Sequence, residues 1–271
     1  MRRKSARATS LLVTLGLATV GVKAQTVTAP SAAELAKITE RGRALTEYDQ
    51  AAWHATDAVQ TANPKTVEGQ HYLAKKENER WTVVFGASNR DKSRFLINYE
   101  AEQLAKPKEF EVKKDEPAKE ETTFYLFAAR ALEMALADFG RTNRPYNGAV
   151  LPVAGCEAKD QPGLLYVYVY PAQTKAGIYP LGGDVRYLVS ADGMKIIEKR
   201  QMHKTVLDFA PAKGKKMVAG YHTHVLSDIP EDTDVLHVLQ QDPPMPEMIM
   251  TQHFVYEVAS DGTIRIKKQK K

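Results

Sequence analysis

Two Asp-Gly dipeptides, Asp192-Gly193 and Asp261-Gly262, constrain the fold of this chain more than any other feature of its sequence. Each dipeptide lies between two runs that are rich in β-branched and aromatic residues. An Asp-Gly pair in this setting favours the tight turn of a β-hairpin, which joins antiparallel strands. The sequence therefore predicts a mainly β C-terminal half, with strands over 149–153, 164–170, 184–190, 195–200, 216–224, 248–258 and 263–267.

Two helical patterns accompany these strands. Over 122–139, apolar residues recur at three- and four-residue spacing, and Gly140 follows directly, as is common after a helix end. A shorter helix is predicted over 230–241, because Pro230 suits a first helical turn and Asp242-Pro243-Pro244 stops the pattern. The C-terminal half thus combines a mixed or antiparallel sheet with one long and one short helix.

The N-terminal part shows helical patterns followed by strand patterns. Ser31, with Glu34 three residues later, forms a capping box and predicts a helix over 31–48. A second helix is predicted over 49–61, before Asn63-Pro64. Alternating or β-branched runs then predict an antiparallel meander over 71–75, 80–86 and 95–100.

Together these patterns predict an α+β protein with two domains. Its 43% hydrophobic and 26% charged residues are globular values that exclude a disordered chain. We expect a helix-plus-meander domain over 26–116 and an α+β domain over 117–271. Residues 103–121 are dense in Lys, Glu and Pro, so they are expected to form either a linker or an exposed sheet edge.

The first residues are typical of a secretory signal. Arg2, Arg3 and Lys4 give the chain a cationic start. Residues 11–22 form an apolar run that is shorter than the roughly 20 residues a transmembrane helix needs. Small residues precede a predicted cleavage site after residue 24. We therefore expect a signal peptide over 1–24, a periplasmic or secreted protein, and no transmembrane span after signal removal. An uncleaved anchor and a plain N-terminal helix are the alternatives.

The charge balance depends on this segment. The whole chain has 38 basic and 33 acidic residues, a formal net charge of +5. The first 24 residues hold five of the basic residues and no acidic one, so the remainder balances 33 against 33. An excess of positive charge is the electrostatic signal for a nucleic-acid partner, and it disappears with the signal segment. No nucleic-acid partner is therefore expected.

One group of residues has the spacing of a metal site. His222 and His224 lie two apart in a predicted strand, so their imidazoles point to the same face. Asp234, in the first turn of the following helix, can return to the end of that strand. Two histidines and one aspartate can hold Zn²⁺ and leave one position for water, which such a centre activates. Equally, a His-x-His pair can be structural, and acidic residues stabilise any helix N-terminus.

These residues resemble the JAMM (JAB/MPN-like) zinc proteases, over about residues 120–266. That family has His-x-His followed by Ser-x-x-Asp, with a glutamate from an earlier strand. The resemblance implies that His222, His224 and Asp234 are zinc ligands. Here the connecting loop is one residue shorter, Glu231 stands where the serine belongs, and 144–149 contains no glutamate to act as the general base.

The other histidines lack ligand spacing. His237, three residues beyond Asp234, is an outlying candidate ligand. The rest are expected to be structural or exposed: His54, His71, His203 and His253.

Two functions remain open from the sequence. The favoured one is a non-catalytic envelope or secreted protein that binds an unknown protein, peptide or glycan through its β surface. The alternative is a zinc-dependent JAMM-like peptidase or hydrolase that uses His222, His224 and Asp234, with its catalytic residues unknown. Zinc is a possible cofactor in that alternative.

Overall fold

The computed structural model describes residues 27–63, 70–155, 163–209 and 218–270. The predicted signal peptide, 1–24, lies outside these described residues. Within them the chain has an α+β fold with three helices and four mostly antiparallel sheets, as the sequence predicts. The helices are α1 (Ala32–Ala62), α2 (Phe124–Phe139) and α3 (Asp232–Gln240).

The strands are numerous and range from four to twelve residues in length. In chain order they are β1 (His71–Glu77), β2 (Arg80–Ser88), β3 (Phe95–Gln103), β4 (Phe110–Glu121), β5 (Tyr146–Pro152), β6 (Leu165–Pro171), β7 (Tyr179–Gly182), β8 (Val185–Val189), β9 (Ile196–Gln201), β10 (Val206–Phe209), β11 (Gly220–Thr223), β12 (Glu247–Met250), β13 (Phe254–Val258) and β14 (Ile264–Gln269).

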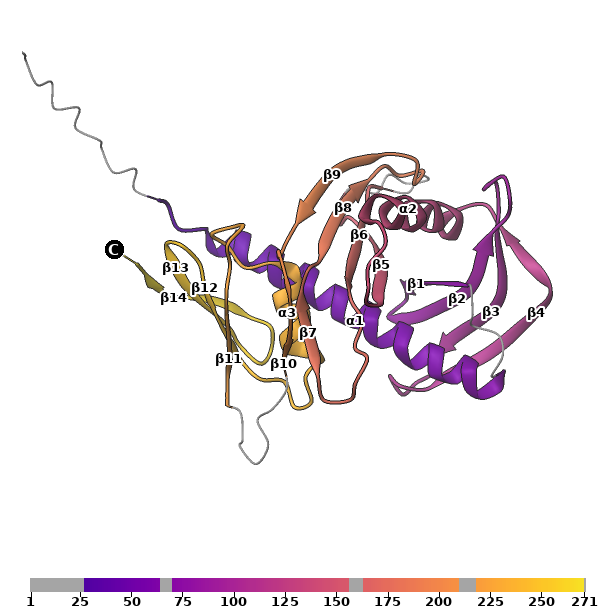
Figure 1. The fold of residues 1–271 in the computed structure, drawn as a ribbon. Helices are drawn as coiled ribbons and strands as arrows, with labels where there is room; N and C mark the ends of the chain where they lie inside the picture. Colours follow the sequence, from indigo (N-terminus) through magenta and orange to yellow (C-terminus); the bar gives the residue numbers. More distant parts are fainter. Residues whose placement is uncertain (1–26, 64–69, 156–162, 210–217, 271) are drawn as a thin grey trace, which may run out of the picture.

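Helix α1 is one continuous helix of 31 residues, so the predicted division into two helices was wrong. The capping box between Ser31 and Glu34 is present at its start. The buried stripe continues through Tyr48 and on to Ala52 and Val59 without a helix-breaking residue, so the helix does not stop. Helix α1 runs the length of the molecule, from the β11–β14 sheet to the β1–β4 sheet (Figure 1).

The N-terminal strands form the predicted antiparallel meander, in the order β1-β2-β3-β4. Residues 110–121, within the Lys/Glu/Pro-rich stretch, form the exposed edge strand β4 rather than a linker. The expected domain boundary at 116–117 lies inside this strand. The division into two domains stays a prediction.

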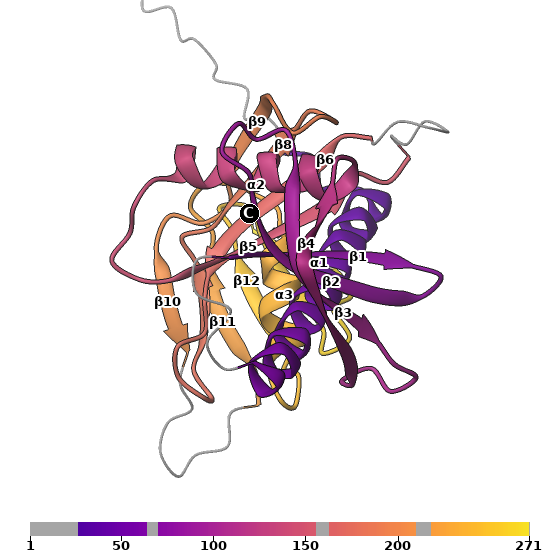
Figure 2. The same cartoon turned by 90° about the vertical axis from the view of Figure 1, so that its right-hand side faces the viewer.

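The C-terminal strands divide among three sheets, where the sequence predicted one. Strands β5-β6-β8-β9 form an antiparallel sheet beneath α2, β7 and β10 form a separate pair, and β11-β12-β13-β14 form a mixed sheet with β11 parallel to β12 (Figures 1 and 2). Both Asp-Gly hairpins are present, with Gly193 and Gly262 at positive φ. Strands β7 and β10 are only four residues long, and the sequence gives no strand pattern for them.

The core is built around α1. One cluster packs Leu45, Tyr48 and Val59 against Phe85 of the meander and Tyr168 of β6. A second cluster surrounds α2, and a third joins the start of α1 to α3 and the β11–β14 sheet. No helix in the described part of the chain is long and apolar enough to cross a bilayer.

The crossing of α1 and α3 is close because of Gly42. A Cβ atom at this position would lie 2.4 Å from the Cβ of Val235 and 2.6 Å from the carbonyl oxygen of Asp232. Real Cβ atoms essentially never approach other atoms this closely. The glycine therefore sets how near α3 lies to α1.

We predict that Gly42→Ala lowers the free energy of unfolding by about 1–3 kcal/mol, since the added methyl group overpacks this crossing. Helix propensity alone predicts the opposite sign, a gain of about 0.5–1 kcal/mol. Urea unfolding of the two proteins measures the difference. An unchanged or raised stability of Gly42→Ala would show that the crossing is not tightly packed.

Candidate metal centre

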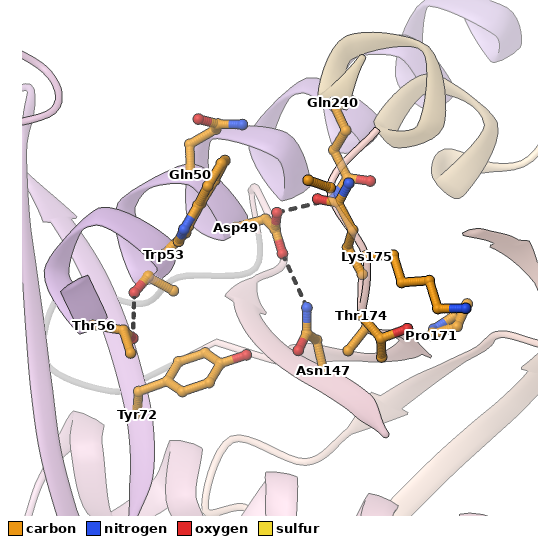
Figure 3. Close-up of a pocket in the computed structure, with 14 residues that line it drawn as sticks. Asp49, Gln50, Trp53, Thr56, Tyr72, Asn147, Pro171, Thr174, Lys175 and Gln240 are labelled. Carbon is orange, nitrogen blue, oxygen red and sulfur yellow. Dashed lines mark hydrogen bonds between the residues drawn. The ribbon is translucent and has the colours of Figure 1, made fainter. Parts of the chain in front are cut away.

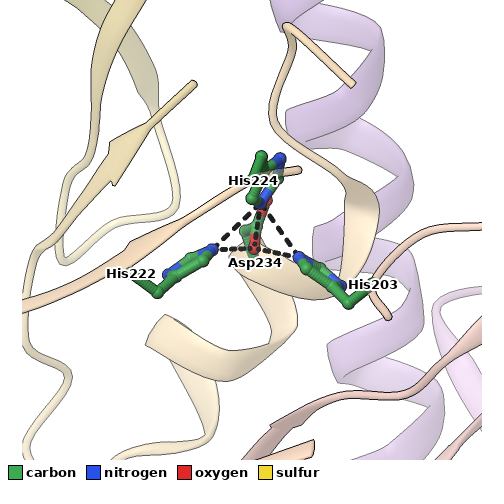
Figure 4. Close-up of side chains that lie close together, drawn as sticks. All are labelled: His203, His222, His224 and Asp234. Atoms are coloured by element: carbon green, nitrogen blue, oxygen red, sulfur yellow. Dashed lines mark hydrogen bonds and ion pairs between the residues drawn. The ribbon is translucent and has the colours of Figure 1, made fainter. Parts of the chain in front are cut away.

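Four buried side chains from separate parts of the chain converge in the C-terminal half (Figure 4). His203 lies between β9 and β10, His222 in β11, His224 just after β11, and Asp234 in the first turn of α3. One ligand atom from each lies within 4.8 Å of the other three. None of the four side chains is more than 8% exposed.

The three imidazoles meet through their Nε2 atoms. His224 Nε2 is 2.9 Å from His203 Nε2 and 2.9 Å from His222 Nε2. Asp234 Oδ1 is 3.1 Å from His203 Nε2, 3.1 Å from His222 Nε2 and 3.4 Å from His224 Nε2. Five of the six separations among these four potential ligand atoms thus lie between 2.9 and 3.4 Å.

The far nitrogen of each imidazole has its own acceptor. His203 Nδ1 is 2.8 Å from Asp184 Oδ1, and His222 Nδ1 is 2.8 Å from Glu247 Oε1. His224 Nδ1 is 2.9 Å from the carbonyl oxygen of Ile229. Each acceptor requires a hydrogen on Nδ1, which in a neutral imidazole leaves the lone pair on Nε2. Such acceptors orient histidine ligands in metal sites.

This arrangement needs positive charge at its centre. Three Nε2 lone pairs and a carboxylate oxygen facing one another without water would repel. A tetrahedral zinc ion with bonds of about 2.0–2.1 Å separates neighbouring ligand atoms by about 3.3 Å. Five of the six separations, at 2.9–3.4 Å, are close to that value. The donor set therefore fits a metal ion of zinc's size, after a small expansion.

Without a metal, protons supply the positive charge. Burial alone would lower the pKa of His222, but Asp234 and Glu247 raise it to about 9. Burial also opposes ionisation of His203, yet Asp184 and Asp234 raise its pKa well above the ordinary value. Burial would raise the pKa of Asp234, but His224 and His203 hold it well below its usual range. The carboxylate is therefore ionised in either state.

The start of α3 carries two more buried acids, each with its own partner. Glu231 accepts hydrogen bonds from Arg200 at 2.7 and 2.9 Å, and Ser227 donates to it at 3.0 Å. The Glu231 carboxylate is therefore held in an ion pair with Arg200. Asp232 is fully buried and pairs with Arg41 and Arg186.

The structure brings together the three residues that the sequence singled out, His222, His224 and Asp234. Their role as metal ligands stays a prediction. The expectation for His203 was incomplete: this histidine is buried, but it lies within the group rather than apart from it. No spacing signal marks His203, because its approach depends on how β9 and β10 are placed. His237 lies outside the group, with its Nε2 3.4 Å from Glu247 Oε2.

The comparisons assign no family to this fold or site. The chain matches no protein-family model, and no curated protein or solved structure is significantly similar to it. The resemblance to JAMM proteases therefore stays a prediction from the sequence.

The histidine pKa values predict how the stability of metal-free protein depends on pH. The pKa of His222 is about 9 when folded, above its ordinary value of 6.5, so its stabilisation is complete below about pH 6.5 and is lost as pH rises to about 9. We expect chelator-treated protein to lose up to about 3 kcal/mol of unfolding free energy over this range. Urea unfolding at several pH values measures the loss, and a flat or rising profile would contradict it.

Proposed function

We propose that this protein binds one transition-metal ion, most readily Zn²⁺, in a closed centre of three histidines and one aspartate. Three imidazole Nε2 atoms converge on Asp234 Oδ1 in a buried site, and each Nδ1 atom is held by an acceptor. This convergence supports the proposal. Imidazole and carboxylate ligands in tetrahedral array suit zinc, whereas Cu²⁺ and Ni²⁺ favour tetragonal geometry.

The centre supports a non-catalytic role better than a hydrolytic one. Catalytic zinc sites keep one coordination position open for water or substrate, whereas structural sites fill all four with protein ligands. His203 Nε2 lies at the fourth corner, 2.9 Å from His224 Nε2 and 3.1 Å from Asp234 Oδ1. A metal held here joins the β9–β10 connection, β11 and α3, which are three separate segments.

In this proposal the protein is exported and acts in the periplasm or outside the cell. The cationic start and the short apolar run at 11–22 support export. The balanced charge of the remaining chain supports the absence of a nucleic-acid partner. A protein, peptide or glycan is the expected ligand class, and the metal holds the fold that presents its binding surface.

A zinc-dependent peptidase or hydrolase is the second candidate. A pocket of about 440 Å³ lies beside the centre and is lined by Thr223, His224 and Ser227, among others. If His203 left the metal, His222, His224 and Asp234 would remain as a catalytic-type ligand set, and the His203–Asp184 pair would stand beside the open position as a proton acceptor. Measurable peptide hydrolysis by the zinc-loaded wild type would favour this candidate over the closed centre.

We predict that untagged protein contains about one equivalent of zinc per chain, measured by inductively coupled plasma mass spectrometry. The double variant His222→Ala, His224→Ala should lose it, because two of four ligands are removed. His71→Ala is the matched control, since His71 lies on β1 outside the group, and it should keep the metal.

The proposed function would be wrong if the wild type held less than about a tenth of an equivalent of zinc per chain, even after zinc is added back to chelator-treated protein. Equal zinc in the wild type and the double variant would place the metal elsewhere. The add-back experiment uses the wild type alone, so it does not depend on the folding of any variant.

A further inference from the structure

A second polar pocket, separate from the metal centre, lies where α1 meets the end of α3. It has a volume of about 490 Å³ and includes none of the four residues of the metal centre. Its walls come from α1, β1, β5, the end of β6 with the segment that follows it, and the last residue of α3 (Figure 3). This volume is within the range of pockets that hold small molecules, about 300–1,000 Å³.

The floor of this pocket is an oriented carboxylate. The Tyr170 hydroxyl donates to Asp49 Oδ1 at 2.7 Å, and Asn147 Nδ2 lies 3.5 Å from the same oxygen. Gln240 Nε2 donates to Asp49 Oδ2 at 2.9 Å. These donors come from β6, β5 and α3, so Asp49 is fixed by three elements. A carboxylate has about four acceptor positions, so it can accept a further hydrogen bond from a ligand.

An exposed indole forms one wall. Trp53 lies one helical turn after Asp49 on the same side of α1, and its side chain lines the pocket (Figure 3). It is 54% exposed, whereas Trp81 is only 7% exposed. The His54 ring stacks with the indole at 5.2 Å between centroids and 11° between planes. Packing in the hydrophobic core therefore does not explain why a tryptophan occupies this position. Aromatic side chains with one exposed face are typical of binding surfaces.

The charges of the residues that line the pocket indicate which class of ligand fits it. Asp49 and Lys175 are its charged residues, and their charges have opposite signs. The other polar lining residues are amides and hydroxyls, such as Gln50, Asn147 and Thr174. Because these two charges cancel, the pocket has no net charge that would attract a polyanion or a strongly cationic ligand. Mixed donors and acceptors beside an aromatic face match a neutral, hydroxyl-rich molecule.

We propose that this pocket binds a sugar ring of a neutral oligosaccharide. The apolar face of the ring packs on Trp53, and its hydroxyl groups donate to Asp49 and exchange hydrogen bonds with Asn147 and Gln240. The pocket shares no residue with the proposed metal centre, so no metal ligand has to take part in sugar binding. The ligand is either a free oligosaccharide or the glycan of a wall polymer, which share this chemistry.

Isothermal titration calorimetry with chitotriose, cellotriose and maltotriose tests the proposal on the full-length protein. We expect saturable binding of at least one of these sugars. Trp53→Ala should weaken it about tenfold or more, since a buried tryptophan contact commonly contributes 1.4 kcal/mol or more. Tyr221→Ala is the matched control, because Tyr221 is also an exposed aromatic residue, at 70%, but lies on β11 outside the pocket.

Tryptophan fluorescence gives a second, local readout. The chain has two tryptophans, Trp53 and Trp81, so Trp81→Phe leaves the pocket indole as the fluorophore. Sugar binding should shift its emission to shorter wavelength, because the ring displaces water from the indole. Because Trp53 is exposed, Trp53→Ala is expected to keep its fold, and circular dichroism checks this.

Two results would overturn the proposal: no heat and no emission change with any of the three sugars up to about 10 mM, or binding that Trp53→Ala leaves unchanged. Co-sedimentation with purified peptidoglycan sacculi separates the two ligand sources. Co-sedimentation that Trp53→Ala abolishes supports a wall glycan, and binding of soluble sugar alone supports a free oligosaccharide.

Discussion

Three carboxylates are buried at the start of α3, and side chains from the surrounding helices and strands neutralise them. Glu231, Asp232 and Asp234 are at most 3% exposed. A buried charge without a partner costs several kcal/mol, so each must be matched. Arg200 of β9 matches Glu231, Arg41 of α1 and Arg186 of β8 match Asp232, and the three-histidine group faces Asp234. One short helix thereby fixes the placement of α1 and of the strands around it.

The same helix connects the two candidate sites. Its first turn supplies Asp234 to the metal centre, and its last residue, Gln240, orients Asp49 in the polar pocket. Gly42 allows α3 to lie directly against α1, which carries Asp49 and Trp53. The geometry of both sites therefore depends on how α3 crosses α1. The polar contacts at each end of α3 hold the two helices in this arrangement.

The sequence predicted the features that depend only on residues close to one another in the chain. The Asp-Gly hairpins, α2 and the capping box of α1 follow from neighbouring residues, and the pairing of His222 with His224 follows from the two-residue period of a strand. The continuity of α1 was missed, because burial along its length outweighed the weak signals for a break. His203 was missed because its position beside His224 is set by tertiary packing, which no spacing in the sequence records.

In the proposed centre, three imidazoles and one carboxylate bind a single metal ion. X-ray absorption spectroscopy at the zinc edge of the zinc-loaded wild type measures this directly. We expect a four-coordinate shell of nitrogen and oxygen at about 2.0–2.1 Å, with the outer-shell scattering of three imidazoles. A shell with fewer than three imidazoles, or with five or six light ligands, would contradict the closed centre.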